Sequence, residues 1–202
     1  METTAGDTRT QWLIDQQNCV IGFSVRHVLS GNVKGSFKIF DAEIFTSSNR
    51  FNDVNINFWI QANSLMTDNV KRDEHLKGKE IFDVENHPRI KFISDTVVIS
   101  GPDHLHEISG DLTMMNITKN VKLDVRFCGL LHDIWGNERA GFSVTGKIKR
   151  SDWGLVWLNP TDFAGLIVSD EIAISCEVEL TKPSRKKRTM QVEAEGENFG
   201  IA

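Results

Sequence analysis

The chain has 202 residues, enough for one domain with a sizeable core, and its 40% hydrophobic and 25% charged content is ordinary for a folded soluble protein. A net charge of −5 disfavours a general nucleic-acid binder, which carries a basic face. No apolar stretch approaches the roughly 20 residues of a membrane span, and the opening METTAGDTRTQ lacks the apolar core of a signal peptide. We therefore expect a cytoplasmic protein.

Alternation of apolar and polar residues dominates the chain and predicts strands with one buried and one exposed face. In VNINFWIQA, which begins at Val54, apolar side chains share one face and only Trp59 breaks the pattern. About eight or nine strands follow, and they form either a barrel or a sandwich, because both explain the alternation. The clearest strands cover residues 54–62, 121–128, 142–149 and 172–180, and the weaker ones cover 10–15, 19–28, 33–44, 89–99 and 105–114.

One helix and two terminal segments interrupt this rhythm. SLMTDNVKRDEHLKG predicts a helix over residues 67–77, with Thr67 as N-cap, Asp68 in the first turn and Gly78 as the stop. Residues 1–10 are expected to be a flexible N-terminus. Residues 182–202 combine a basic run, KPSRKKR, with an acidic one, EAEGEN, and are expected to be a disordered tail.

Metal and cofactor sites are not expected. The three cysteines are far apart and show no CxxC or Cys/His ligand spacing, which favours small buried hydrophobic residues. His104 and His106 lie on one face of an expected strand, but a third ligand is not evident, and we interpret them as a solvated strand end.

Seven short motifs occur in one order, and together they resemble the YceI-like family of lipocalin-like, polyisoprenoid-binding proteins. They are WLID, FSVRH, RDEHL, IFDVENHPRIKF, GDLT, ITK and RSDWG, and the resemblance spans residues 11–181. It implies an all-β fold: an extended antiparallel lipocalin-like β-barrel of about eight strands, with one helix packed near one end. It also implies binding of long apolar chains, polyisoprenoids or fatty amides, in the barrel interior. The chain departs from the family at Met115-Asn116, where a glycine commonly precedes the Thr-Lys pair.

The resemblance and the alternation together predict which side chains face the lumen. Trp153 and Trp157 follow the strand over residues 142–149 in a glycine-containing segment, and we expect them to border the ligand entrance, since tryptophan suits a boundary that is apolar on one side. Ordinary core packing is the alternative. The expected lumen residues are Phe23, Val25, Phe58, Ile60, Phe92, Leu112, Leu123, Val125, Phe142 and Val144.

The run Arg72-Asp73-Glu74-His75 raises the question of a polar site. On a helical wheel Arg72 shares a stripe with Leu65 and Leu76, so it needs a partner, because an unpaired buried charge is costly. The alternation also carries Arg150 and Asp152 inward. As a neighbour on the helix, Asp73 is poorly placed to pair with Arg72, so the partner of Arg72 should come from elsewhere in the fold. We therefore expect Arg72 and Arg150 to meet at one end of the barrel, satisfied by Asp73, Asp152 or both, and His75 to lie on the rim. This polar end either closes the barrel or contacts a ligand head group.

Three functions remain open from the sequence. The leading hypothesis is a carrier that binds a long-chain apolar lipid in the lumen and has no catalytic residues. The second is an enzyme that acts on such a lipid with Arg72, Asp73 and His75, and the third is a structural barrel with a packed interior. We also expect a homodimer, and weak contact of the basic tail with a membrane surface.

Overall fold

The computed structural model describes residues 9–27, 31–47, 51, 53–99, 105–155 and 168–182 of the chain. They form strands and three short helices: α1 (Val70–Lys77) and the 3-10 helices η1 (Ala62–Ser64) and η2 (Arg150–Trp153). The strands are β1 (Thr10–Ile14), β2 (Val20–His27), β3 (Gly31–Phe37), β4 (Phe40–Thr46), β5 (Asn55–Gln61), β6 (Leu65–Met66), β7 (Arg89–Ile99), β8 (Leu105–Met114), β9 (Ile117–His132), β10 (Glu138–Lys149) and β11 (Val168–Lys182).

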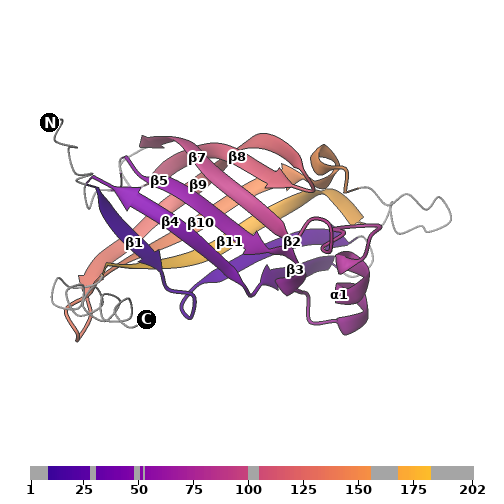
Figure 1. The fold of residues 1–202 in the computed structure, drawn as a ribbon, viewed down its shortest axis with the longest axis horizontal. Coiled ribbons are helices and arrows are strands. Elements are labelled where there is room, and N and C mark those ends of the chain that lie inside the picture. The colour runs from indigo at the N-terminus through magenta and orange to yellow at the C-terminus, as the bar shows by residue number, and fades with distance from the viewer. Residues whose placement is uncertain are drawn as a thin grey trace, which may run out of the picture.

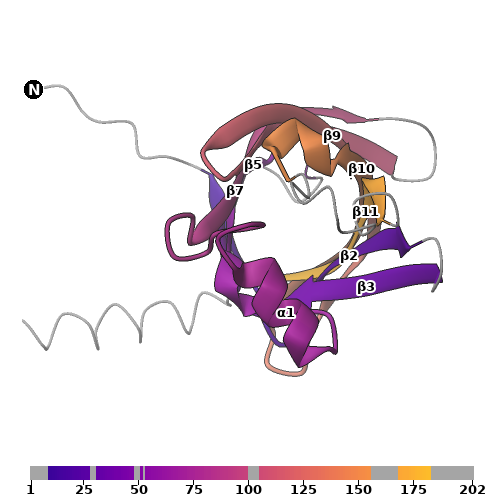
Figure 2. The ribbon, with the colours of Figure 1, turned by 90° about the vertical axis from the view of Figure 1, so that its right-hand side faces the viewer.

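The strands form a closed antiparallel barrel of eight long strands, which confirms the predicted barrel and excludes the sandwich. Closure occurs at β1, which pairs with β4 on one side and with β11 on the other. Three of the long strands are interrupted: β1 continues as β2, β3 as β4, and β5 as β6, so that β2 also pairs with β11, and β6 with β3. The barrel is elongated, and α1 lies beside one opening (Figures 1 and 2).

The helix α1 joins the third long strand to the fourth and is shorter than predicted. It begins after Asn69, whose side chain accepts a hydrogen bond from the Arg72 backbone N–H at 3.0 Å, and it ends at Gly78 as predicted. Thr67 is therefore not the N-cap. Asp68 precedes the helix with a φ of 60°, in the left-handed region, and so does not lie in its first turn. No helix in the described part of the chain is long and apolar enough to cross a membrane.

Two strand boundaries also differ from the prediction. The segment 33–44 is not one strand, because the chain bends at Lys38 and Ile39, whose backbone N–H groups donate to the Ser64 hydroxyl. Strand β9 continues past Cys128 to His132, and a bulge opposite Gly141 and Phe142 leaves Cys128 without a partner on β10. An extra residue in one strand resets the alternation, so the period-two pattern ends there although the strand does not.

The hairpin between β8 and β9 shows what replaces the family's glycine. Met115 and Asn116 form the turn with φ values of 49° and 61°, both in the left-handed region. Positive φ at both central residues is typical of a type I′ turn, the two-residue connection that matches the twist of the flanking strands. The tight hairpin is therefore kept without the glycine, and Thr113 and Thr118 bond across it through their hydroxyls at 2.8 Å.

A candidate ligand-binding cavity

The barrel interior contains a cavity of about 540 Å³. Ligand cavities in proteins commonly measure 300–1,000 Å³, so this one is large enough for a small molecule. Its wall is apolar along the barrel, and all ten predicted lumen residues lie in it: Phe23, Val25, Phe58, Ile60, Phe92, Leu112, Leu123, Val125, Phe142 and Val144.

At two places in the cavity wall a phenylalanine ring packs directly against a glycine of the neighbouring strand. A Cβ atom at Gly35 would lie 2.3 Å from the Phe23 ring, and one at Gly110 would lie 2.6 Å from the Phe92 ring. Both distances are too short for any side chain, so each ring can lie flat along the wall only beside glycine. Glycine within a strand often marks such a close approach.

An aromatic cluster packs at the end of the barrel away from α1. Phe51 reaches inward from the connection between β4 and β5, and its ring lies 4.9 Å from that of Phe142 and 5.1 Å from that of Trp12. Phe127 completes the cluster, 5.4 Å from Phe142. Trp12 is fully buried and Phe51 is 6% exposed, and Phe51 and Phe142 also line the cavity, so the cluster forms its wall at this end. Sequence alternation missed Phe51, because it belongs to a connection and not to a strand.

At the α1 end the cavity wall becomes polar, and Arg72 is one of its cations. The Arg72 guanidinium donates from Nε to the Thr67 hydroxyl at 2.7 Å and from Nη2 to the Thr67 carbonyl at 2.6 Å. The buried Asp73 carboxylate accepts from the Thr67 backbone N–H at 2.9 Å and from its hydroxyl at 2.5 Å. Asp73, one of the two carboxylates predicted to satisfy the arginines, reaches Arg72 only through Thr67, which stands between the two charges and bonds to both.

Arg150 lines the same cavity from η2, which lies at the α1 end of the barrel (Figures 1 and 2), so the structure brings the two arginines to one end. Its guanidinium donates to the backbone carbonyls of Leu155 at 2.5 Å and Ser169 at 3.2 Å, with a third contact to Val168 at 3.5 Å. These contacts tie the end of β10 to the start of β11. We call the described cavity-lining side chains of Thr67, Arg72, His75 and Arg150 the collar.

Asp152 and His75 complete the comparison with the predicted polar end. Asp152 is exposed and does not line the cavity, so its predicted inward position is wrong. The strand ends at Lys149, and residues 150–153 turn into η2, where the period of two no longer applies. His75 lies at the rim as predicted: it lines the cavity, its side chain is 55% exposed, and it approaches the Glu80 carboxylate at 4.0 Å.

The structure places Trp153 in the core and not at the entrance. It is 1% exposed, and its indole N–H donates to the Leu112 carbonyl at 3.2 Å. The alternative interpretation of Trp153, ordinary core packing, is therefore the correct one, because η2 directs the indole ring into the core. Trp157 lies outside the described residues.

Two further residues line the cavity: His106, which was misjudged from the sequence, and Cys176, whose burial was predicted. His106, interpreted as part of a solvated strand end, lines the cavity and is half-buried. Cys176 lines it as a buried thiol, and burial raises its pKa to about 11. The signal for His106 was available in the sequence, since it shares a strand face with Ile108.

The geometry defines a closed, lipocalin-like antiparallel barrel with an apolar interior cavity and a polar collar at one end. Comparison with known proteins agrees: the sequence model of the YceI-like domain matches residues 12–180. The Protein YceI of Salmonella newport is 32% identical over 177 residues, which cover 87% of this chain and 90% of the relative. The chain belongs to the YceI-like family.

Two solved structures share the fold. A YceI protein of Campylobacter jejuni is 30% identical with a TM-score of 0.67, over 78% of this chain and 90% of that one. A polyisoprenoid binding domain from Saccharophagus degradans has a TM-score of 0.61 over 85% of this chain and 98% of that one. At 14% identity the second likeness shows the fold alone.

Proposed function

We propose that this protein binds and carries a long-chain apolar lipid, a polyisoprenoid or a fatty amide-like molecule, inside the barrel. The observation that carries the proposal is the continuous cavity of about 540 Å³ with an apolar wall drawn from the whole length of the barrel. A barrel packed solid, the structural alternative, would leave no such space. The polyisoprenoid binding named for the Saccharophagus degradans domain supports the ligand class.

The size of the cavity sets the length of chain that it can enclose. A methylene group occupies about as much space as a water molecule, roughly 30 Å³ in the liquid, so the cavity would hold on the order of 15–20 carbon atoms. Each buried CH₂ contributes roughly 0.8 kcal/mol, so such a chain would gain on the order of 12–16 kcal/mol, against an association cost of roughly 4–15 kcal/mol. Burial of the chain alone can therefore support binding.

We propose that the collar contacts the polar end of the ligand. The Arg72 contacts described above use Nε and Nη2 and leave Nη1 beside the cavity, where it can donate to a hydroxyl, amide or phosphate oxygen. Arg150 instead spends its described hydrogen bonds on backbone carbonyls, so its role is to hold the barrel end together. Arg72 would therefore recognise the polar end of the ligand, and Arg150 would stabilise the end of the barrel.

We propose binding without catalysis. Cys176 is the described thiol in the cavity wall, and burial raises its pKa to about 11, so it stays protonated and weakly nucleophilic at neutral pH. The Thr67 hydroxyl already donates to Asp73, and Asp73 also holds the Thr67 backbone N–H. Arg72 and Asp73 are thus occupied with holding Thr67 and shaping the collar.

Identification of a co-purified lipid tests the proposal. The purified protein is examined by native mass spectrometry, and its organic extract is analysed for lipids. A bound apolar chain released on denaturation, together with unchanged lipid after prolonged incubation, is the expected result. Protein that carries no lipid and takes up neither a polyprenol nor a fatty amide contradicts binding, and turnover of the bound lipid contradicts the absence of catalysis.

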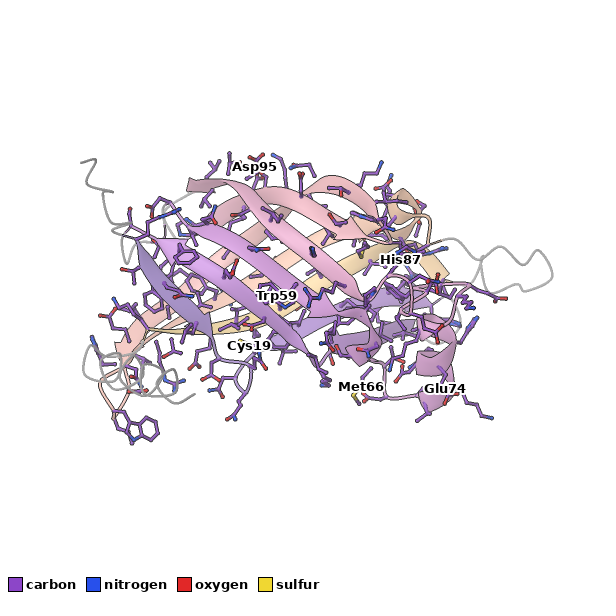
Figure 3. The ribbon with its side chains drawn as sticks, viewed as in Figure 1. Cys19, Trp59, Met66, Glu74, His87 and Asp95 are labelled. Carbon is purple, nitrogen blue, oxygen red and sulfur yellow. The ribbon has the colours of Figure 1, made fainter. Side chains whose placement is uncertain are left out.

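We also propose a homodimer and weak contact of the basic tail with a membrane surface. Trp59 points outward from β5, since its neighbours Phe58 and Ile60 line the cavity, and it lies on the outer wall (Figure 3). Burial of this partly exposed ring against a second copy would stabilise a dimer. Light scattering at micromolar concentration should return twice the 22.8 kDa mass of the chain, and the mass of one chain would exclude the dimer.

A further inference from the structure

The aromatic cluster bounds the cavity at the end of the barrel away from α1. Phe51 and Phe142 line the cavity there, and we call these two rings the floor. Trp12 and Ala140 belong to the same buried cluster, are fully buried and do not line the cavity, so they form a packed layer beneath the floor. The Lys182 ammonium lies 5.1 Å from the centre of the Trp12 ring, at the last residue of β11. Among the described residues, the cavity therefore ends at packed side chains and not at an opening.

The backbone at Phe51 is strained. Its φ is 55°, in the left-handed region, where a bulky side chain is a genuine outlier. Such residues persist only where the surrounding structure fixes them, and they gather at functional sites such as ligand clamps. Here the buried Thr46 hydroxyl and the Ser47 N–H donate to the Asp53 carboxylate at 2.9 and 3.0 Å. These bonds anchor both ends of the β4–β5 connection, and Phe51 lies between them in the chain.

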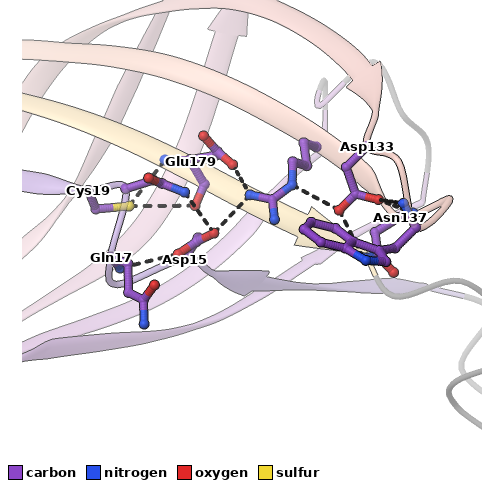
Figure 4. A network of polar contacts seen from close by, with 9 residues as sticks. Asp15, Gln17, Cys19, Asp133, Asn137 and Glu179 are labelled. Carbon is purple, nitrogen blue, oxygen red and sulfur yellow. Dashed lines mark hydrogen bonds and ion pairs between the residues drawn. The ribbon is translucent and has the colours of Figure 1, made fainter.

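A charge network fixes the barrel wall at the same end (Figure 4). Arg139, which precedes Ala140 on β10, donates to Asp133 at 3.1 Å, to Asp15 at 2.9 Å, and also to Glu179. These carboxylates come from the β9–β10 turn, the segment after β1, and β11. The network therefore joins the strands where the barrel closes and opposes their separation around the floor.

The distance from the floor to the collar agrees with the capacity of the cavity. Phe142 and Arg150 both line the cavity and are eight residues apart. At about 3.3 Å per residue and a strand tilt of about 35–45°, they are separated by about 20 Å along the barrel axis. An extended chain advances about 1.2 Å per bond, since a residue of three backbone bonds spans about 3.5 Å. A chain of about 17 carbons therefore reaches from the collar to the floor.

We propose that Phe51 sets the length of the chain that the protein binds, an inference that rests on the proposed lipid-binding function. A ligand whose polar end contacts the collar extends only as far as the floor, and a longer chain has to leave carbon atoms outside the lumen. Phe142 belongs to β10, but Phe51 belongs to a connection. Its ring is therefore the part of the floor that can be shortened without a change in a strand.

Affinities for polyprenols of graded length test the proposal. Chains of about 15, 20, 25 and 30 carbons bracket the capacity of the cavity, and displacement of an apolar fluorescent dye reports each affinity. Each buried methylene is worth about fourfold in affinity, so the affinity of the wild type should rise up to about 20 carbons and then stop rising. Phe51→Ala frees the space of about six carbons, roughly one isoprene unit. The affinity for the 25-carbon chain relative to the 20-carbon chain should therefore increase at least about tenfold.

Phe45→Ala provides the matched control, because it removes the same ring from the same end of the barrel. Phe45 lies on β4 beside the lining residue Ile44, does not line the cavity, and has the Arg9 guanidinium 5.8 Å from its ring centre. Its removal should leave the dependence of affinity on chain length unchanged. Phe51→Leu, a milder change, should shift the dependence in the same direction as Phe51→Ala but less far.

The ratio of two affinities measured on one preparation does not depend on the fraction of protein that is folded, so a loss of stability in Phe51→Ala does not alter it. An unchanged ratio in both Phe51 variants, or an equal increase in Phe45→Ala, would overturn the role of Phe51 and leave lipid binding intact. A wild type that binds no polyprenol of any length would instead contradict the proposed function and this inference together.

Discussion

Substitution of Val144 by tryptophan is the sharpest test of a lumen that holds lipid. Val144 lies midway along β10, between Val125 of β9 and Cys176 of β11, and all three line the cavity. A tryptophan there projects into space that the ligand chain would occupy. Thr145→Trp is the matched control, because Thr145 is the next residue along and is exposed on the outer face.

The expected loss follows from the atoms that the new ring displaces. Tryptophan has about seven more side-chain non-hydrogen atoms than valine, and at roughly 0.8 kcal/mol per displaced CH₂ the upper bound is about 5–6 kcal/mol. Adjustment of the chain in a cavity of about 540 Å³ should recover part of this loss. We expect a net loss of about 3 kcal/mol, which is roughly a hundredfold in affinity.

The affinity of a polyprenol of about 20 carbons, the upper end of the capacity estimate, can be measured by displacement of the apolar dye phenylnaphthylamine. Val144→Trp should lose affinity while its melting temperature stays near that of the wild type, because the ring fills a cavity instead of overpacking a dense core. Thr145→Trp should leave both quantities unchanged. Equal affinities for the two variants would refute binding in the lumen, since only one of them reduces its volume.

Three further outcomes follow from the collar, the charge network and the cysteines. Arg72→Leu removes the hydrogen bonds to Thr67 and should weaken binding of a polyprenol at least tenfold, while it lowers the free energy of unfolding by about 1–3 kcal/mol. Lys71→Leu, on the exposed side of α1, should change neither the affinity nor the stability. An unchanged affinity in Arg72→Leu would refute the head-group contact. Desolvation raises the pKa of Asp133, but hydrogen bonds from Asn137 and Arg139 outweigh it and lower the pKa to about 2. The ionised carboxylate therefore stabilises the folded state fully above the unfolded pKa near 3.9, and this stabilisation is lost as the pH falls toward 2. The melting temperature of Asp133→Asn should therefore lie below that of the wild type at pH 7, and the gap should close by about pH 2; a gap independent of pH would contradict the assignment. An aqueous thiol reagent should modify the exposed Cys128 first and the buried Cys176 only on unfolding, which mass spectrometry of the tryptic peptides can follow.

Much of the fold was readable from the sequence because one face of each strand is buried. The inward residues Phe58, Phe92 and Phe142 were identified from alternation together with the family resemblance, since a strand places successive side chains on opposite faces. The same rule failed where the backbone stops being a regular strand. It carried Asp152 inward although residues 150–153 turn as η2, and it ended the ninth strand at the Cys128 bulge.

The collar shows what the sequence could not predict for polar residues, namely their hydrogen-bond partners. A helical wheel placed Arg72 on an inward face, and strand parity led to Arg150, so two independent periodicities located both arginines at one end of the cavity. Neither periodicity could identify the hydrogen-bond partners of the two arginines. Thr67 accepts from Arg72 and donates to Asp73 because the chain turns at Asp68 before the helix begins, and this turn depends on a backbone conformation that residue spacing does not reveal.

The sequence by itself determined the strand character, the inward faces and, through its motifs, the family. Only the tertiary structure decided that the lumen is open, that Phe51 joins the aromatic cluster at one end, and that Trp135 is exposed in the turn between β9 and β10. The physical reason is the difference between local and long-range properties of the chain. Alternation records whether a side chain faces inward, which is a local property, whereas an empty volume or a surface cluster depends on how residues distant in the chain are brought together when β1 closes the barrel against β11.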